Sequence, residues 1–156
     1  MTEFSHLDAR GAARMVDVSG KQVSARTATA TGRVNVSSEV VALLKSGDIP
    51  KGDALAVARI AGIQAAKRTP DLVPLCHPIA IHGVDVDLAV ETDHVAIRAL
   101  VRTADRTGVE MEALTCVTVA GLALIDMVKA VDPAATITDV RVDEKTGGSS
   151  GTWRRD

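Results

Sequence analysis

The stretch TGVEMEALTCVTVAGLALIDMVKAV at residues 107–131 decides the fold of this chain. Thr107 is followed three residues later by Glu110, which is the spacing of a capping box, where the two side chains bond to each other's free backbone N–H groups. Residues 113–125 are then almost wholly apolar. A helix that is apolar on most of its circumference is buried in a core or an interface. The pattern therefore predicts a buried helix over residues 107–131.

Three charged residues interrupt this apolar helix, and they fall on one side of it. At about 100° per residue, Asp126 lies about 40° from Glu112, and Lys129 lies about 60° from Asp126. At about 1.5 Å of rise per residue, however, Glu112 and Asp126 are about 21 Å apart. The helix is therefore expected to carry one polar stripe with two separate polar ends.

The composition limits the partners that the chain can have. Its 156 residues suit one domain with a sizeable core, and 46% of them are hydrophobic. One Phe, one Trp and no Tyr leave few rings for base stacking, and a formal charge of -2 disfavours a nucleic-acid backbone. Two cysteines without a C-x-x-C pair indicate a reducing compartment, and no signal peptide or membrane span is recognisable. We therefore expect a cytoplasmic protein that binds neither nucleic acid nor membrane.

The remaining patterns predict strands and helices in a definite order. Alternating residues predict strands at 14–18, 22–36, 79–89, 95–101 and 136–142. Ser37 or Ser38 can cap a helix over 39–45, and Asp53 can cap a second helix that runs through Lys67. From residue 22, strand, helices, strand, strand, helix, strand is the order of the ferredoxin-like split β-α-β arrangement. We therefore predict an α+β, ferredoxin-like fold with an antiparallel sheet and helices packed on one face. An N-terminal arm (1–13), a single domain (14–143) and a flexible C-terminal loop and tail (144–156) complete the expected organisation.

In that fold the two long helices lie antiparallel, so their polar ends form two predicted clusters. One cluster joins the start of the second helix to the end of the long helix and contains Lys51, Asp126 and Lys129. The other lies at the opposite end and contains Lys67, His77, Glu110 and Glu112. Because helix rise alone separates the clusters by about 20 Å, one nucleotide-sized ligand cannot use both within a subunit. We therefore expect the pocket to lie at an interface between subunits.

Each cluster has both a chemical and a simpler interpretation. An aspartate between two lysines can support proton transfer, but Asp126 and its lysines can also form an ordinary surface ion network. Glu112 can accept from a guanine-like N–H edge, or it can be a first-turn acid favoured by the helix dipole. His77 alone is more often structural than a ligand, and no second pair with metal-ligand spacing supports a zinc site with Cys76. Arg26 can face a phosphate or water.

Several strings resemble the cyclic pyranopterin monophosphate synthase family of molybdenum cofactor biosynthesis. They are MVDVS at 15–19, KGD at 51–53, ARIAGIQAAKRT at 58–69, PLCHP at 74–78, TGVEMEALT at 107–115, DMVKAV at 126–131 and KTGG at 145–148. The resemblance implies a ferredoxin-like catalytic domain in a homohexamer, a trimer of dimers with interface active sites. It also implies a lyase that converts 3′,8-cyclo-7,8-dihydro-GTP to cyclic pyranopterin monophosphate and releases pyrophosphate.

The resemblance also assigns roles by motif. Asp126 matches the family's catalytic acid/base, with Lys129 and Lys51 as its essential partners. Matching the substrate-binding segments are Leu75, Cys76, His77, Met111 and Glu112, with Lys67, Arg26, Asp17, Glu110 and Lys145 at further positions around the substrate. The tail departs from the family pattern, because Ser149 stands where a lysine commonly follows the glycine pair. No tightly bound cofactor is implied, although Mg²⁺ can accompany the substrate triphosphate.

Two other functions remain open at the level of the sequence. The first is a non-catalytic nucleotide- or pterin-binding regulatory module, since this fold often carries such functions. The second is an RNA-binding sheet of the same topology, which the scarcity of aromatic residues and the acidic pI of about 6.1 disfavour. The lysine–aspartate arrangement favours the enzyme over the regulatory module, because a binding module needs no acid between two lysines.

Overall fold

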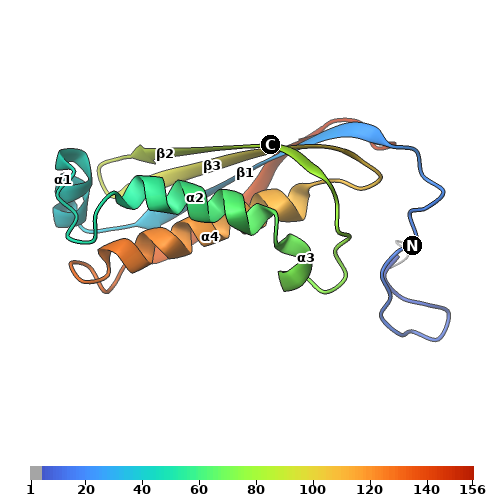
Figure 1. Ribbon diagram of the computed structural model, residues 1–156, viewed down its shortest axis with the longest axis horizontal. Helices are drawn as coiled ribbons and strands as arrows, with labels where there is room; N and C mark the ends of the chain where they lie inside the picture. The colour runs from blue at the N-terminus through green and yellow to red at the C-terminus, as the bar shows by residue number, and fades with distance from the viewer. Residues whose placement is uncertain (1–4) are drawn as a thin grey trace.

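A five-stranded antiparallel sheet is the frame of the computed structural model, which describes residues 5–156 (Figure 1). The strand order is β2-β3-β1-β4-β5. The first four of these strands have the order of a ferredoxin-like sheet, so the predicted fold class is confirmed. Along the chain the elements are β1 (Ser24–Asn35), α1 (Ser38–Ser46), α2 (Ala54–Ala66), α3 (Thr69–Leu72), β2 (Ile81–Val90), β3 (His94–Asp105), α4 (Glu110–Val128), β4 (Thr136–Thr146) and β5 (Trp153–Arg154).

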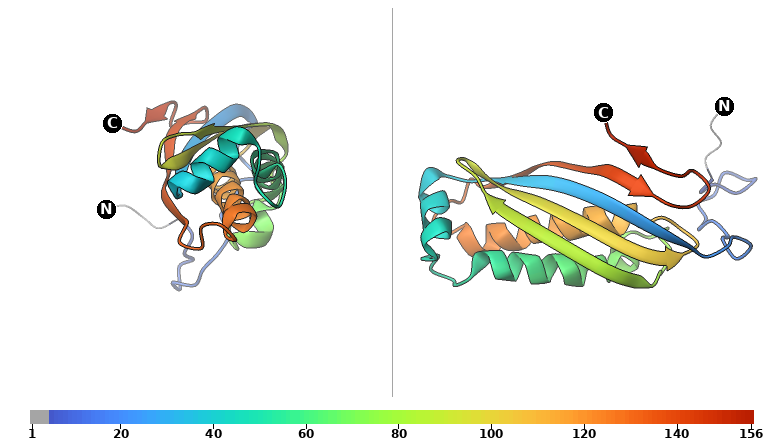
Figure 2. Two further views of the ribbon diagram at one scale, coloured as in Figure 1. Left: turned by 90° about the vertical axis from the view of Figure 1, so that its left-hand side faces the viewer. Right: turned by 90° about the horizontal axis from the view of Figure 1, so that it is seen from above.

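The two faces of the sheet differ because side chains alternate along each strand. On the central strand β1, Ala28, Ala30 and Val34 are fully buried towards the helices. Thr31 and Arg33 lie between them and belong to the opposite face. The helices cross one face of the sheet diagonally, and the other face is left without a helix among residues 5–156 (Figure 2). The core therefore lies in a single layer between the sheet and the two long helices.

The helices α2 and α4 lie side by side and antiparallel, in close contact (Figure 1). Their approach depends on Gly62, where an added Cβ would stand 2.9 Å from the carbonyl oxygen of Cys116 and 3.1 Å from the Cβ of Ala120. By length and composition α4 could span a membrane, yet half of its apolar window is buried inside this domain. A core helix of this kind is sufficient to explain its apolar character.

Two of the predicted helix caps are present. Ser37 caps α1 by accepting from the backbone N–H of Val40, and Gly47 ends that helix with φ 78°. Asp53 caps α2 by accepting from the backbone N–H of Ala56, and Lys67 is its C-cap residue. Beyond α2, the sequence TPDL forms the short helix α3, which the sequence did not predict.

The predicted capping box of α4 is wrong. The helix begins at Glu110 with Val109 as its N-cap residue, and no side chain caps it. The hydroxyl of Thr107 donates instead to the carbonyl of Gly108, and the Glu110 carboxylate pairs with Lys145 of β4 at 3.2 Å. The Glu110 carboxylate therefore forms an ion pair with a cation on β4 instead of the capping hydrogen bond that its spacing from Thr107 predicted. The helix also ends at Val128, before the predicted residue 131.

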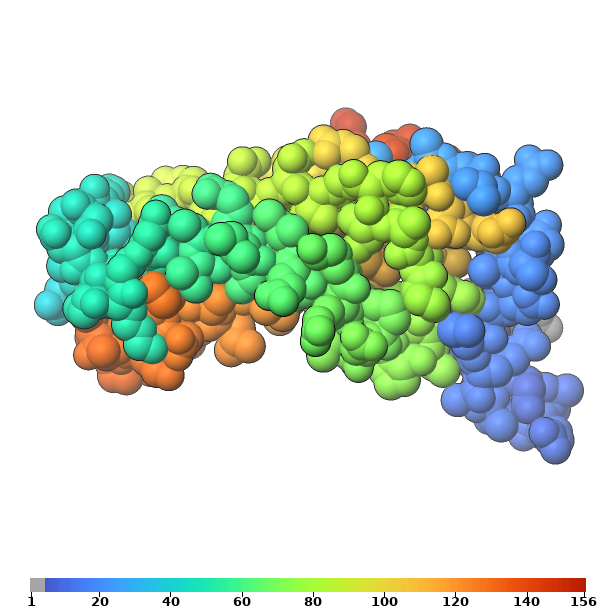
Figure 3. Space-filling view, in the orientation of Figure 1, coloured from blue at the N-terminus to red at the C-terminus, as the bar shows by residue number. Residues whose placement is uncertain are grey.

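The described chain before β1 forms a projection at one end of the molecule (Figure 3), and hydrogen bonds from His77 to Val16 and from Arg106 to Lys21 attach it to the rest of the fold. Residues 1–4 of the predicted arm lie outside the described residues, and the following ones form a turn closed by a bridge between Leu7 and Ala13. The strand predicted at residues 14–18 is wrong, since that segment finds no neighbouring strand to pair with. Alternation alone cannot create a strand without a partner for its backbone groups.

The C-terminal segment is more regular than its composition suggests. The strand β4 continues to Thr146, whose hydroxyl bonds to that of Thr27 at 2.7 Å. The chain then turns back, and Trp153 pairs with Lys145 in the short strand β5. The sequence KTGGSSG predicted a flexible loop from residue 145, but pairing with β1 orders its first two residues.

Candidate active site

The lysine–aspartate cluster, which consists of Lys51, Asp126 and Lys129, is confirmed as a set of direct contacts. Nζ of Lys129 donates to Oδ1 of Asp126 at 2.6 Å, and Nζ of Lys51 donates to Oδ2 of the same carboxylate at 3.2 Å. Nζ of Lys51 also donates to the backbone carbonyl of Asp126 at 3.0 Å. Both carboxylate oxygens are therefore occupied by ammonium groups, one from the turn before α2 and one from the end of α4, which meet at the same end of the antiparallel helix pair.

Local structure explains why these three residues meet. Asp126 lies in the last turn of α4 and Lys129 is its C-cap residue, so the two share one face through i,i+3 spacing. Lys51 lies in the turn before the Asp53 cap of α2. Hydrogen bonds from Lys129 and then from Lys51 hold the pKa of Asp126 below its usual range. The carboxylate is thus ionised at neutral pH.

All three side chains of this cluster are about half exposed. Exposed ion pairs stabilise a fold by only about 0–1 kcal/mol, so the cluster contributes little to folding. Two cations and one anion leave a local excess of positive charge at the end of the helix pair. Such a group can hold an anionic ligand and exchange protons with it.

The glutamate–cysteine cluster, which consists of Glu112 and Cys76, lies at the opposite end of α4. Glu112 is only 1% exposed, and its Oε1 accepts from the thiol of Cys76 at 3.5 Å. Its Oε2 is buried and has no hydrogen-bond partner among residues 5–156. Burial raises the pKa of Glu112, and burial together with the Glu112 charge raises the pKa of Cys76 to about 11.

Four further predicted residues lie around this end of the sheet and helices. The His77 ring bonds to the carbonyl of Val16, while Lys145 pairs with Glu110 as described above. The Asp17 carboxylate accepts from the backbone N–H of Ser19, which lowers the pKa of Asp17. Arg26 also lies at this end, where backbone carbonyl groups hold its guanidinium.

The guanidinium of Arg26 is fixed by the backbone of the segment that precedes α4. Its Nε donates to the carbonyl of Asp105 at 3.2 Å and its Nη2 donates to that of Arg106 at 3.4 Å. A Cβ on Gly148 would stand 2.2 Å from Nη1 of Arg26, so the glycine leaves room for the guanidinium. The tail loop and the arginine therefore form one wall, and Ser149 lines the hollow of about 550 Å³ beside it.

Three predicted residues are not drawn into these contacts. Lys67 is exposed at the end of α2, and its side chain forms no ion pair within the described residues. Met111 is exposed on the first turn of α4, and Leu75 is half-buried in the connector before β2. The second predicted cluster is therefore wrong as a set of touching side chains. Its residues only lie at the same end of the fold: Lys67, His77, Glu110 and Glu112.

Asp105 and Arg106 are additional candidates that the sequence did not single out. They line a hollow of about 510 Å³ together with Asp17 and His77. Asp105 accepts from the backbone N–H of Ala80 at 3.1 Å. Their position at the end of β3, in the chain that leads into α4, was the available signal, because connections between elements often carry site residues.

Comparison with known proteins identifies the family. A sequence model of the MoaC family matches residues 15–148 of this chain. The chain belongs to the MoaC family. A cyclic pyranopterin monophosphate synthase of Streptomyces avermitilis is 68% identical over 152 residues, which cover 97% of this chain and 89% of that protein.

Other MoaC-family relatives cover the chain equally well. A cyclic pyranopterin monophosphate synthase of a Nocardioides species is 67% identical over 155 residues, with 97% of this chain and 95% of that protein covered. Cyclic pyranopterin monophosphate synthase 2 of Mycobacterium tuberculosis is 60% identical over 153 residues, with coverages of 98% and 92%. The MoaC match contains every predicted site residue, from Asp17 to Lys145, and ends just before Ser149.

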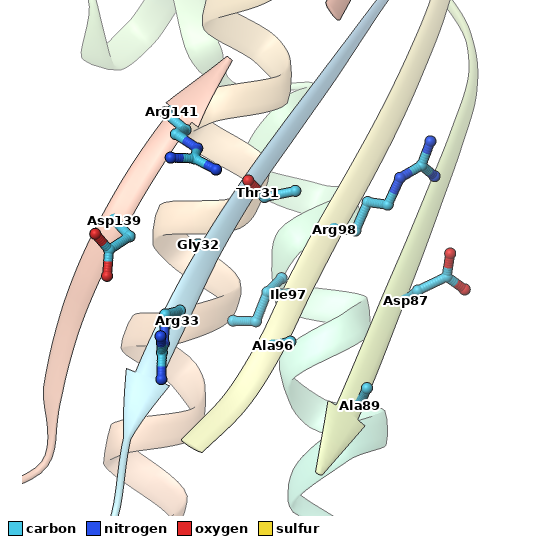
Figure 4. A pocket seen from close by; sticks show the side chains of 10 residues that line it. All are labelled: Thr31, Gly32, Arg33, Asp87, Ala89, Ala96, Ile97, Arg98, Asp139 and Arg141. Atoms are coloured by element: carbon cyan, nitrogen blue, oxygen red, sulfur yellow. The ribbon is translucent and has the colours of Figure 1, made fainter. Parts of the chain in front are cut away.

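The MoaC-family chain also has a hollow of about 550 Å³ on the open face of its sheet (Figure 4). Arg33, Arg98 and Arg141 border it, together with Asp87 and Asp139. None of the predicted site residues lines this hollow. Its acidic and basic groups come from four strands and lie on the face of the sheet opposite the two helix-end clusters, so this hollow is distinct from the candidate active site.

Proposed function

We propose that this MoaC-family protein is a cyclic pyranopterin monophosphate synthase. It would convert 3′,8-cyclo-7,8-dihydro-GTP to cyclic pyranopterin monophosphate and release pyrophosphate, as a phosphorus–oxygen lyase of molybdenum cofactor biosynthesis. The observation that carries the proposal is the Asp126 carboxylate bonded on each oxygen to a different lysine, in a chain with close relatives of that name. A non-catalytic binding module would not need this arrangement.

The chemistry requires proton transfers and one displacement at phosphorus, with no net oxidation or reduction. Asp126 is ionised at neutral pH, so in the resting state it serves as a proton acceptor and holds the two ammonium groups in place. Lys51 and Lys129 are the donors that protonate the rearranging ring. When a substrate hydroxyl attacks the α-phosphorus, the P–O bond to pyrophosphate breaks, and nearby cations stabilise the leaving anion.

The two clusters of one chain are too far apart for one ligand, so we propose that two copies share each site. From Glu112 to Asp126 the helix rises by about 21 Å. Between these ends the helix layer exposes apolar side chains, with Ile60 65% exposed and Leu122 60% exposed. A hollow of about 370 Å³ lies between the helices, with Val119 in its lining. Exposed apolar surface of this kind marks an interface between proteins.

A two-fold contact through this helix face explains the separation of the clusters. A two-fold axis across α4 runs the helices of two copies antiparallel, so that each lysine–aspartate cluster lies beside the glutamate–cysteine cluster of the other copy. We further propose that three such dimers form the homohexamer. Any Mg²⁺ would then enter on the triphosphate, since no group of three or more His, Cys, Asp or Glu residues within 5–156 could hold a metal. The two free thiols suit the reducing cytoplasm that we propose as its location.

A turnover assay tests the reaction. The purified protein is incubated with 3′,8-cyclo-7,8-dihydro-GTP, and pyrophosphate and the cyclic phosphate product are measured. Wild type should release one pyrophosphate for each molecule of product, whereas Asp126→Asn should release no pyrophosphate and form no product. Lys45→Ala is the matched control, because Lys45 is an exposed lysine at the end of α1 outside both clusters. Tight binding without pyrophosphate release would favour the regulatory module and contradict the proposal.

Mixing two inactive variants tests whether the site is shared. Lys129→Ala disables the lysine–aspartate cluster and Glu112→Gln disables the other cluster, so neither variant alone should turn over. In a mixed dimer one of the two shared sites is intact, and random pairing should restore about a quarter of wild-type activity. If each site lay within one chain, no mixed dimer would contain an intact site. Absence of any recovery after proven subunit exchange would therefore refute the shared site.

A further inference from the structure

The buried carboxylate of Glu112 has one oxygen with a partner and one without. Oε1 accepts from the thiol of Cys76, whereas Oε2 is buried with no partner among the described residues. The whole residue is 1% exposed, and no cation pairs with it within residues 5–156. Buried polar atoms are rarely left without a hydrogen bond, because the loss of water is then uncompensated. The free oxygen therefore calls for a donor from outside these residues, as a ligand or a second copy of the chain would supply.

The position of the thiol is fixed by the connector that carries it. The backbone N–H of Cys76 donates to the carbonyl of Val73 at 3.0 Å, and the next residue, His77, bonds through its ring to Val16. Pro74 and Pro78 restrict the backbone on both sides. With a pKa raised to about 11, the thiol keeps its proton at neutral pH and remains a donor. A rigid connector thus holds a permanent S–H group against one face of the carboxylate.

We propose that Cys76 is a positioning residue that orients the Glu112 carboxylate for the substrate. Its S–H donates to Oε1 and thereby fixes the rotation of the carboxylate, so that Oε2 is presented to an N–H edge of the guanine-derived ring. The inference rests on the proposed function, and it assigns the thiol a role that acts through Glu112 and not through contact with the ligand.

Cys116 provides a matched control within the same protein. It is a fully buried free thiol on α4, and burial alone raises the pKa of Cys116 to about 12. Its sulfur packs against Gly62 of α2, since a Cβ added to that glycine would lie 3.2 Å from it. The thiol makes no hydrogen bond to a carboxylate among the described residues. Removing this thiol therefore changes packing one turn from Glu112 without removing a hydrogen bond to its carboxylate.

The first test separates binding from turnover in four variants: Cys76→Ala, Cys76→Ser, Cys116→Ala and Cys116→Ser. Loss of a hydrogen bond to a charged group should raise the KM of Cys76→Ala about tenfold while kcat stays within about twofold. Cys76→Ser keeps a donor and should recover most of the wild-type KM. Both Cys116 variants should keep the wild-type KM. Equal KM values for the two alanine variants, or a serine variant as poor as Cys76→Ala, would overturn the proposal.

The second test does not depend on turnover. The titration of Glu112 is followed by NMR in protein with ¹³C-labelled glutamate carboxyls, and its signal is assigned by its loss in Glu112→Gln. Because the thiol hydrogen bond lowers the pKa of Glu112 against the effect of burial, Cys76→Ala should raise this pKa further. Cys76→Ser and Cys116→Ala should not. A raised KM with an unchanged Glu112 titration would mean that the thiol contacts substrate directly, which refutes positioning. If wild type shows no turnover, the proposed function fails, while the titration still decides the role of Cys76.

Discussion

Replacing Glu112 by Gln should make the free protein more stable while abolishing its activity. The carboxyl has an ordinary pKa of 4.5, and burial raises the pKa of Glu112 in the folded chain. As the pH rises from about 4.5 towards the raised pKa of folded Glu112, the unfolded chain releases its proton before the folded chain does. The free energy of unfolding therefore falls with rising pH, and wild type at pH 8 carries the full penalty of a buried, uncompensated carboxylate.

The size of the effect follows from the burial of Glu112. A buried polar group without a partner costs about 1–3 kcal/mol, and glutamine removes the charge but still leaves a polar amide. We therefore expect Glu112→Gln to gain about 1 kcal/mol at pH 8, or about 2–4 °C in Tm for a domain of this size. At pH 4, where the wild-type carboxyl is protonated, the gain should vanish. Glu110→Gln is the matched control, because it removes a carboxylate that is already paired with Lys145.

Differential scanning calorimetry of wild type and both variants at pH 8 and pH 4 measures the effect. The same samples in the turnover assay should show that Glu112→Gln is inactive at pH 8. An equal change in Tm at both pH values, or a lower Tm of Glu112→Gln at pH 8, would refute the reasoning. The latter result would show that a cation compensates the carboxylate in the assembled protein.

The remaining predictions concern catalysis, assembly and packing. Lys51→Ala and Lys129→Ala should each lower kcat at least about 100-fold in the pyrophosphate assay. The Tm should change by less than about 3 °C, because the ion pairs are exposed. Retention of most activity would contradict the roles of these lysines. Leu122→Glu places a charge on the apolar helix face, so it should reduce both the oligomer mass measured by light scattering and the turnover. A dissociated protein that stays active would contradict the shared site. Gly62→Ala should lower the free energy of unfolding in urea by about 1–3 kcal/mol, because the alanine methyl group would stand 2.9 Å from a backbone oxygen of α4. An unchanged urea midpoint would show that the two helices can move apart at no cost in stability. Ser37→Ala should lower stability by about 1 kcal/mol through loss of the α1 cap, with unchanged turnover as the control.

The parts of the site that could be predicted are those set by spacing along one helix or by the antiparallel order of two. Lys129 reaches Asp126 because the two are three residues apart on α4. Lys51 reaches the same carboxylate because α2 begins where α4 ends. Both contacts follow from the fold class, which hydrophobic periodicity made predictable.

The parts that could not be predicted depend on side chains from distant segments. The thiol–carboxylate contact of Cys76 and Glu112 requires a connector to settle against the first turn of α4, and nothing in either local sequence indicates it. The carboxylate of Glu110 was assigned to a cap because its spacing from Thr107 fits one. In the structure it pairs with Lys145 instead, because β4 brings that ammonium group to 3.2 Å from the carboxylate at the start of α4.

The sequence by itself determined the order of the long strands and helices from residue 22 onward, the caps of α1 and α2, and the burial of α4, because these depend on periodicity and on contacts between residues close in the chain. Only the tertiary structure decided which carboxylate has a free oxygen, where Arg26 is held and where α4 begins. Those features depend on the packing of β4, the connector before β2 and the segment after β3, which meet only once the sheet has formed.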